Sequence, residues 1–265
     1  MSYYLNVDNI DNAWEVLMAE LYSQKEDFCL DSRDGVVVGE LLNACITIKD
    51  PTRCILKSRK RKMPTRYAIG ELLWYLSGSN KVDDIGVYSK VWKNLTDNGE
   101  TVNSAYGYRI FEKYGFDQMD YVYKVLKEHP DSRQAVIHIK DAINYLDYPT
   151  KDVPCTIALQ YFIRDGKLHT TTYMRSNDIW TGFPYDVFSF TAFQTMLAFK
   201  LNVGIGEYTH IAGSLHLYER DAISYTKNLE EITNNESEKA TVKSCLLYTS
   251  PSPRDTERSR MPSSA

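Results

Sequence analysis

Three residues whose side chains can do chemistry together occur between positions 152 and 186. They are Cys155, which follows a proline, Arg175, and Asp186, which follows Pro184 closely. A thiolate is a nucleophile, a guanidinium binds anions, and a carboxyl group can carry a proton. This combination indicates a site, provided that the fold brings the three side chains into one small volume.

The segments around these residues predict that the three side chains meet. Thr156–Arg164 and Lys167–Arg175 are rich in β-branched and aromatic residues, and Asp165-Gly166 between them is a two-residue turn signal. In such a hairpin Cys155 opens the first strand and Arg175 closes the second, so both lie at its open end. Pro184 begins a helix that carries Asp186 in its first turn.

Length and composition set broad limits. The 265 residues suit one large domain or at most two, and 43% hydrophobic residues allow a sizeable core. The net charge of −4 argues against a nucleic-acid-binding surface over the whole molecule. No apolar run could span a bilayer, and the N-terminus lacks a signal-peptide core, so we expect a cytoplasmic protein without a membrane partner. Five cysteines without paired spacing predict reduced thiols and no metal site.

Helices and strands alternate without a regular βαβ rhythm, and no glycine-rich phosphate loop occurs, so we expect the α+β class. The predicted helices are Asp11–Lys25, Pro64–Leu76, Phe116–His129, Pro184–Leu201 and a segment from Asp221 towards Ile232. Outside the hairpin, the predicted strands are Val36–Ile48, Ala135–Lys140 and Glu207–Leu217.

Some residues allow an ordinary and a functional interpretation. Glu71 lies on or beside the apolar face of its helix (Ala68, Ile69, Leu72, Leu73 and Leu76), where a glutamate usually turns to solvent. If it points inward beside a pocket, its pKa rises and it can carry protons. Trp92 alone is more often core than ligand platform. The basic run from Lys57 to Lys62 is either a solvated loop or an anion-binding loop, and the first is the more common case.

The C-terminal segment differs from the rest in composition. We predict one domain over residues 1–243 and a tail over 244–265 that is rich in serine, proline and arginine and lacks periodicity. The run CLLYTSPSPRD resembles the translation of a sequencing-library adapter, so this tail is either non-native or disordered.

Seven motifs in order resemble the thymidylate synthase superfamily over roughly residues 30–222. They are GELLWYL (70–76), NSAYG (103–107), PDSR (130–133), PC (154–155), MRSND (174–178), GFPYD (182–186) and GSLHLY (213–218). The resemblance implies a large twisted mixed β-sheet flanked by helices, with one sheet face used for homodimerisation. It also implies a pyrimidine nucleoside monophosphate as substrate, 5,10-methylenetetrahydrofolate as co-substrate, and no requirement for a metal or a nucleic acid.

By the same resemblance, Cys155 is the nucleophile that adds to C6 of the pyrimidine, and a neighbouring arginine would lower its pKa. Glu71 and Tyr106 handle protons. The other expected roles are phosphate binding by Arg33, Arg133, Arg175 and Ser176, sugar binding by His216 and Tyr218, and folate contacts by Trp92, Asp178 and Gly182, with Asp178 also at the nucleotide. Arg133 reaches across a dimer interface in this family, where a second arginine usually follows; here Gln134 stands in its place.

Asp186 indicates which pyrimidine is bound. The synthases carry asparagine at this position, and an amide matches O4 and N3–H of uracil. Cytosine offers a 4-amino donor and an N3 acceptor. A carboxyl group matches both, because it can accept a hydrogen bond from the amino group and its proton can be donated to N3. Taken alone, Asp186 would be interpreted as a carboxylate that interacts favourably with the dipole at the N-terminus of its helix. Within the motif GFPYD, we instead predict that it recognises the base and that this base is cytosine.

The resulting hypothesis is hydroxymethylation of dCMP at C5. MRSND, PCT and GSLH resemble phage deoxycytidylate hydroxymethylases more than synthases. The alternatives are a methyltransferase that makes 5-methyl-dCMP or dTMP, and an inactive relative that binds nucleotide or RNA.

Overall fold

A computed structural model describes residues 2–141 and 150–249, with side chains of the last helix up to Asn234. In the described residues, eight strands form one mixed sheet with the order β1-β3-β8-β6-β5-β4, while β2 pairs with β3 and β7 with β8. The strands are β1 (Tyr3–Val7), β2 (Leu30–Ser32), β3 (Gly35–Ile48), β4 (Val136–His138), β5 (Thr156–Arg164), β6 (Lys167–Met174), β7 (Asn177–Asp178) and β8 (Gly204–Tyr218).

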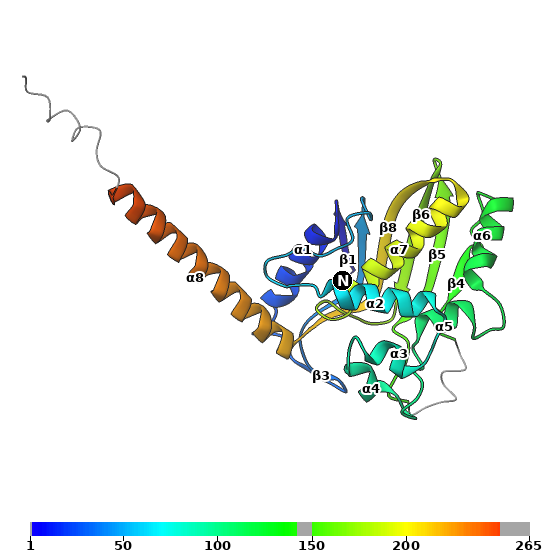
Figure 1. Ribbon diagram of the computed structural model, residues 1–265, viewed down its shortest axis with the longest axis horizontal. Coiled ribbons are helices and arrows are strands. Elements are labelled where there is room, and N and C mark those ends of the chain that lie inside the picture. The colour runs from blue at the N-terminus through cyan, green and yellow to red at the C-terminus, as the bar shows by residue number, and fades with distance from the viewer. Residues whose placement is uncertain (1, 142–149, 250–265) are drawn as a thin grey trace, which may run out of the picture.

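The helices differ in length and in how they contact the sheet (Figure 1). They are α1 (Ile10–Ser23), α2 (Thr65–Leu76), α3 (Val82–Gly86), α4 (Val91–Leu95), α5 (Tyr106–Phe111), α6 (Gln118–Glu128), α7 (Phe183–Leu201) and α8 (Glu219–Thr249). This architecture confirms the expected α+β class.

The two longest strands form the middle of the sheet. β3 and β8 run antiparallel over most of their length, and β8 then pairs in parallel with β6. Because β7 also pairs in parallel with the end of β8, Asp178 lies opposite His216. The strand ends of β5, β6, β7 and β8 therefore bring several of the expected site residues to one region.

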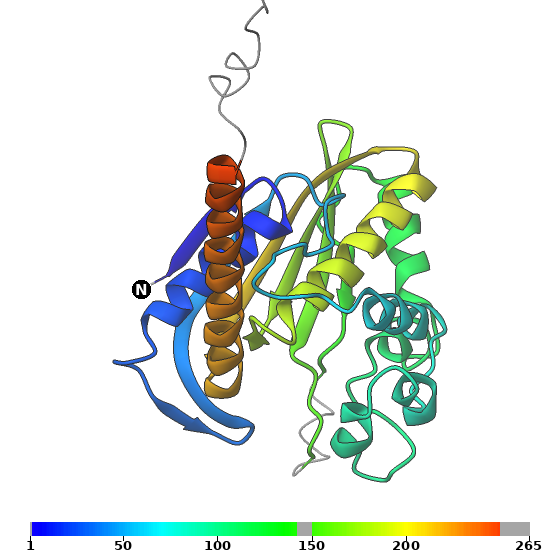
Figure 2. The same cartoon turned by 60° about the vertical axis from the view of Figure 1, so that its left-hand side comes forward.

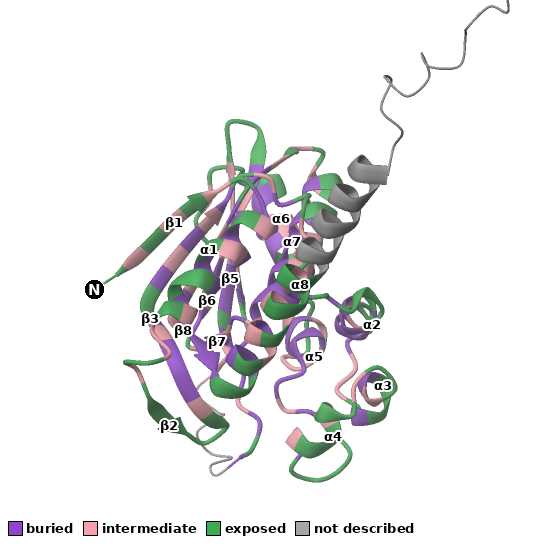
Figure 3. Ribbon diagram, turned by 90° about the vertical axis from the view of Figure 1, so that its left-hand side faces the viewer, coloured by how far each residue is buried: buried purple, intermediate pink, exposed green. Residues whose placement is uncertain are grey.

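One face of the sheet is covered by helices. α1 packs against β3, and α7 packs against β6 and β8 (Figure 2). Fully buried side chains such as Trp14, Phe190 and Phe193 fill the space between the layers, where the buried residues concentrate (Figure 3). The alternate residues of β6 and β8 that point to the opposite face, such as Thr171, Tyr173 and Ile211, are only half-buried, so this face is less covered.

The central hairpin forms as predicted. β5 and β6 pair antiparallel, with Arg164 opposite Lys167. Asp165 and Gly166 both have positive φ, at 49° and 68°. This conformation turns the chain in two residues and matches the natural twist of the strands.

The structure corrects two local predictions. The first helix begins at Ile10, one residue before the predicted start at Asp11, and its N-cap is Asn9, whose side chain accepts from Asn12 N. In α2 the expected apolar stripe faces the core only in part, through Ala68 and Leu72. Ile69 and Leu73 are 52% and 55% exposed, whereas Ala68, Glu71 and Trp74 are buried.

The last helix is longer than expected, because α8 continues past Ile232 to Thr249. It extends away from the sheet and crosses the predicted boundary at residue 243 (Figure 1). Residues 250–265 of the predicted tail lie outside the described residues, so the division into one domain and a tail stays a prediction. Within residues 2–141 and 150–249, no helix is long and apolar enough to cross a membrane.

Candidate active site

Cys155 and Arg175 lie side by side at the open end of the hairpin. Arg175 N donates to Cys155 O at 2.9 Å. The guanidinium donates to the two preceding carbonyl groups, from Nε to Pro154 O at 3.1 Å and from Nη2 to Val153 O at 3.0 Å. Arg175 therefore holds the segment that carries the thiol and also presents a positive charge beside it.

The pKa of the Cys155 thiol is nevertheless raised to about 11. Burial is the largest cause, because removal of the thiolate from water disfavours the charged form. Arg175 acts in the opposite direction, and the nearby carboxylates of Asp186 and Asp152 raise the pKa further. Arg175 therefore lowers the pKa of the thiol as predicted, but burial outweighs it and the net shift is upward.

Tyr106 lies next to the thiol. Its Oη accepts a hydrogen bond from Thr156 N at 3.3 Å, one residue after Cys155. Its ring stacks on Phe190 with centroids 6.0 Å apart. Burial raises the pKa of Tyr106, and the charges of Asp186 and Cys155 add to this effect, so the hydroxyl keeps its proton at neutral pH.

Glu71 points inward from α2 instead of towards solvent. Its Oε1 accepts from Tyr67 Oη at 2.7 Å, and Tyr67 Oη in turn accepts from Trp92 Nε1 at 3.1 Å. Burial raises the pKa of Glu71 to about 7, even though hydrogen bonds from Tyr67 and Tyr75 lower it. A carboxyl group with this pKa can take up or release a proton at neutral pH.

Asp186 occupies the first turn of α7, as expected. Its Oδ2 accepts a hydrogen bond from Asn177 Nδ2 at 2.7 Å. Burial raises its pKa well above the usual range, the charge of Glu71 raises it further, and the Asn177 bond lowers it. Cys155, Tyr106, Glu71 and Asp186 thus influence one another electrostatically, which places all four expected catalytic side chains in one region.

A second group of expected site residues lies where β7 meets β8. Asp178 Oδ1 accepts from Trp180 N at 2.7 Å and from Thr181 N at 3.2 Å, so its carboxylate organises the turn that leads to α7. The rings of His216 and Tyr218 contact edge to face at 5.0 Å. Burial lowers the pKa of His216, so it is a neutral donor or acceptor near neutral pH.

Gly182 has a steric reason for lacking a side chain. A Cβ atom built there would lie 2.8 Å from Asn177 Nδ2 and 3.0 Å from Asp178 O. The glycine therefore allows the turn before α7 to approach β7 closely. Its expected contact with folate stays a prediction.

The expected phosphate ligands are only partly assembled within one chain. Arg33 lies at the β2–β3 turn, bonded to Asp34 at 3.2 Å, and is close enough for the charges of Cys155 and Tyr218 to act on it. Ser176 follows Arg175 on the segment between β6 and β7. Arg133 O accepts a hydrogen bond from Gln160 Nε2 at 3.0 Å, so Arg133 lies beside the middle of β5, several residues beyond Cys155. Arg133 is therefore remote from the thiol of its own chain.

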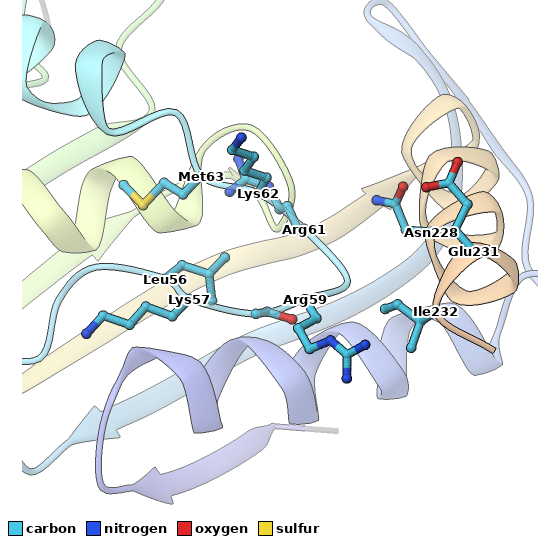
Figure 4. A pocket seen from close by; sticks show the side chains of 10 residues that line it. Leu56, Lys57, Arg59, Arg61, Lys62, Met63, Asn228, Glu231 and Ile232 are labelled. Carbon is cyan, nitrogen blue, oxygen red and sulfur yellow. The ribbon is translucent and has the colours of Figure 1, made fainter. Parts of the chain in front are cut away.

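The basic segment 57–62 contributes one buried cation. Arg61 is 5% exposed, and its guanidinium carbon lies 5.5 Å from the Trp180 ring and 5.4 Å from the Tyr185 ring. Its Nε and Nη1 are buried without a hydrogen-bond partner among the described residues. The segment and α8 enclose a cleft of about 590 Å³ that Lys57, Arg59 and Lys62 also line (Figure 4).

Sequence reasoning missed Asn177, His210, Tyr208 and the individual importance of Arg61. Tyr208 and His210 alternate with half-buried neighbours on β8 and are 0% exposed. Two polar residues at inward positions of a predicted strand are a signal that could have identified them. Among the described residues, no group of histidine, cysteine, aspartate and glutamate could hold a metal ion.

Comparison with known proteins identifies the family. The family model described as thymidylate synthase matches residues 31–244. The chain belongs to the thymidylate synthase family. Members of this family use methylenetetrahydrofolate, an anionic and aromatic molecule. The two Arg61 nitrogens without a partner among the described residues lie near two aromatic rings, and such a site fits a molecule of this kind.

Two curated relatives illustrate the range of activities. The chain is 30% identical over 223 residues to the deoxyuridylate hydroxymethyltransferase of Bacillus phage SP01, covering 78% of this chain and 58% of that protein. It is 33% identical over 171 residues to the thymidylate synthase of Bacillus subtilis subsp. natto, covering 60% of each. The chain thus spans about three fifths of the length of these relatives.

Solved structures confirm the fold. The chain is similar to thermostable thymidylate synthase A from Bacillus subtilis, with a TM-score of 0.68, 25% identity and 84% of each chain covered. The thymidylate synthase of T4 phage matches with a TM-score of 0.65 at 22% identity, covering 79% of this chain and 77% of that one. The expected mixed sheet flanked by helices is therefore confirmed.

Proposed function

We propose that this protein hydroxymethylates dCMP at C5, using methylenetetrahydrofolate as the one-carbon donor. Transfer of a one-carbon unit to a pyrimidine nucleotide follows from family membership. The choice of dCMP rests on one observation: a carboxyl group, that of Asp186, lies within electrostatic reach of Cys155 and Glu71 and has a strongly raised pKa.

A carboxyl group at this place favours cytosine over uracil. When ionised, it offers only acceptors, which match the 4-amino group and a protonated N3 of cytosine but oppose O4 of uracil. When neutral, it pairs with cytosine by donating to N3 and accepting from the amino group. Uracil is matched only by a neutral carboxyl group whose proton faces O4. Cytosine is thus matched in both protonation states of Asp186.

The chain's other residues then have specific tasks. Cys155 adds to C6 of the pyrimidine, which makes C5 nucleophilic, and the charge that develops towards N3 meets the proton of Asp186. The donor supplies a methylene unit at the oxidation level of formaldehyde. C5 forms a bond to this methylene carbon. Loss of the C5 proton, which Glu71 and Tyr106 handle, breaks the bond between the methylene carbon and the folate nitrogen and leaves an exocyclic double bond. Tetrahydrofolate is therefore released without oxidation. Water then adds to the exocyclic carbon while the Cys155 thiolate leaves C6, which restores the aromatic ring.

The proposal also assigns the binding roles that the family resemblance implies. Arg33, Arg175 and Ser176 bind the phosphate, His216 and Tyr218 the sugar, and Trp92, Asp178 and Gly182 the pterin side of folate. The carboxylates of the folate tail fit the basic cleft beside Arg61. The less covered sheet face forms a homodimer, and Arg133 of a second copy completes the phosphate site. Light scattering that shows only monomers would contradict this assembly.

The second candidate is hydroxymethylation of dUMP, which the name of the Bacillus phage SP01 relative favours. Both candidates add water, whereas a methyltransferase oxidises tetrahydrofolate to dihydrofolate. We expect that incubation of dCMP with methylenetetrahydrofolate yields a nucleotide heavier by CH₂O, without the absorbance change of dihydrofolate formation. A product heavier by CH₂, or no product from dCMP, would contradict the proposal. Cys155→Ser is the inactive control.

A further inference from the structure

Behind Asp186 a chain of hydrogen bonds runs into the core. Asn177 Nδ2 lies 2.7 Å from Asp186 Oδ2, and Asn177 Oδ1 lies 3.0 Å from His210 Nε2. His210 Nδ1 lies 2.9 Å from Tyr208 Oη. Asn177 is 3% exposed and both other members are 0% exposed, whereas Asp186 itself is only partly buried. The carboxyl group thus stands between a closed network and the open site.

Each bond in this chain has a defined direction. Asn177 turns its amide nitrogen to the carboxyl group, so its oxygen must accept from His210. Burial lowers the pKa of His210 to about 3, so the ring is neutral and has a single N–H. That hydrogen is on Nε2, which leaves Nδ1 to accept from the hydroxyl of Tyr208. Every bond therefore donates towards Asp186.

This direction makes the two oxygens of Asp186 unequal. Oδ2 accepts from Asn177, and a carbonyl oxygen is a better acceptor than a hydroxyl oxygen, so the acid proton belongs on Oδ1. No hydrogen bond to Oδ1 occurs within the described part of the chain. If the proton of Asp186 could sit on either oxygen, the carboxyl group could offer the hydrogen-bond pattern for cytosine or the pattern for uracil. A proton fixed on one oxygen leaves only one of these two hydrogen-bond patterns.

The geometry points to Asn177, His210 and Tyr208 as positioning residues that fix the proton-bearing oxygen of Asp186 and so give the site its choice between cytosine and uracil. The inference rests on the proposed role of Asp186 in reading the base, but it holds whichever base is preferred. Gly182 supports it, because any side chain there would displace the amide of Asn177.

The experiment measures the ratio of kcat/KM for dCMP to kcat/KM for dUMP. Asn177→Ala should reduce the discrimination between the two bases, so that this ratio moves towards one by a factor of about ten to a hundred. Loss of one fixed polar contact typically changes discrimination by such a factor. Tyr208→Phe keeps the ring and the fold but removes the terminal donor, so it should shift the ratio in the same direction by less. Ser189→Ala is the control, because it removes a fully buried hydroxyl group of α7 that is not part of this hydrogen-bond chain. It should leave the ratio unchanged.

Double variants that include Asp186→Asn distinguish a failure of this inference from a failure of the proposed function. In an Asp186→Asn background, Asn177→Ala should not change the ratio further, because both changes act through one carboxyl group. If Asp186→Asn alters the ratio while Asn177→Ala and Tyr208→Phe leave it at the wild-type value, the positioning inference is overturned and the base-reading role stands. If Asp186→Asn leaves the ratio unaltered, both are overturned.

Discussion

Replacing Glu71 by glutamine tests how strongly the site disfavours a buried charge. Glu71 is 5% exposed and accepts a hydrogen bond from Tyr67 Oη at 2.7 Å. Glutamine has nearly the same shape and keeps an oxygen acceptor, but it cannot ionise. The variant therefore removes the titration of this residue while it preserves the packing of α2.

The magnitude follows from the raised pKa of Glu71, which is about 7 against an ordinary 4.5. Below pH 4.5 the carboxyl group is protonated in the folded and the unfolded chain, and no penalty arises. As the pH rises from 4.5 to 7, the unfolded chain ionises first, so folding stability falls. Above pH 7 the loss is complete and amounts to about 3 kcal/mol, since one pKa unit is about 1.4 kcal/mol.

Urea unfolding between pH 5 and pH 8 measures this loss. The difference in unfolding free energy between Glu71→Gln and wild type should grow with pH towards about 3 kcal/mol in favour of the variant. Loss of the Glu71 charge also relieves Asp186, whose pKa that charge raises, which acts in the same direction. Glu20→Gln, which replaces an exposed carboxylate of α1, is the matched control for the substitution itself. A difference that stays constant across this pH range would refute the reasoning.

Three further variants test other parts of the site. Cys155→Ser should reduce turnover at least ~10³-fold with an unchanged unfolding midpoint; retention of activity would exclude the thiol as nucleophile. Arg61→Met should raise KM for methylenetetrahydrofolate about tenfold and leave KM for the nucleotide unchanged. An effect on KM for the nucleotide alone would contradict the assignment of Arg61 to folate binding. Gly182→Ala should destabilise the fold by ~1–3 kcal/mol, because its Cβ would lie 2.8 Å from Asn177 Nδ2; equal urea midpoints would show that the turn adapts.

The elements that local chemistry determines were predictable from sequence. Asp165-Gly166 specifies a two-residue turn, and the β-rich runs beside it leave Cys155 and Arg175 at the same end of the hairpin. Pro184 marks the start of α7, which places Asp186 in its first turn. The turn signal and the helix-start signal each involve only a few neighbouring residues, so both can be recognised without knowing the rest of the fold.

Properties that depend on distant neighbours were not predictable in this way. The periodicity of α2 suggested a core-facing stripe at Ile69 and Leu73, but contacts with other elements bury Glu71 and Trp74 instead. The charge of Arg175 suggested a low thiol pKa, but burial outweighs it. Asn177 and His210 meet across 33 positions of sequence, so their contact becomes visible only in the folded chain.

The central claim is that the carboxyl group of Asp186 selects cytosine. Direct competition between equimolar dCMP and dUMP, with limiting methylenetetrahydrofolate and products quantified by mass spectrometry, tests it most directly. The account predicts that 5-hydroxymethyl-dCMP exceeds the dUMP product at least about tenfold. An excess of the dUMP product would contradict it.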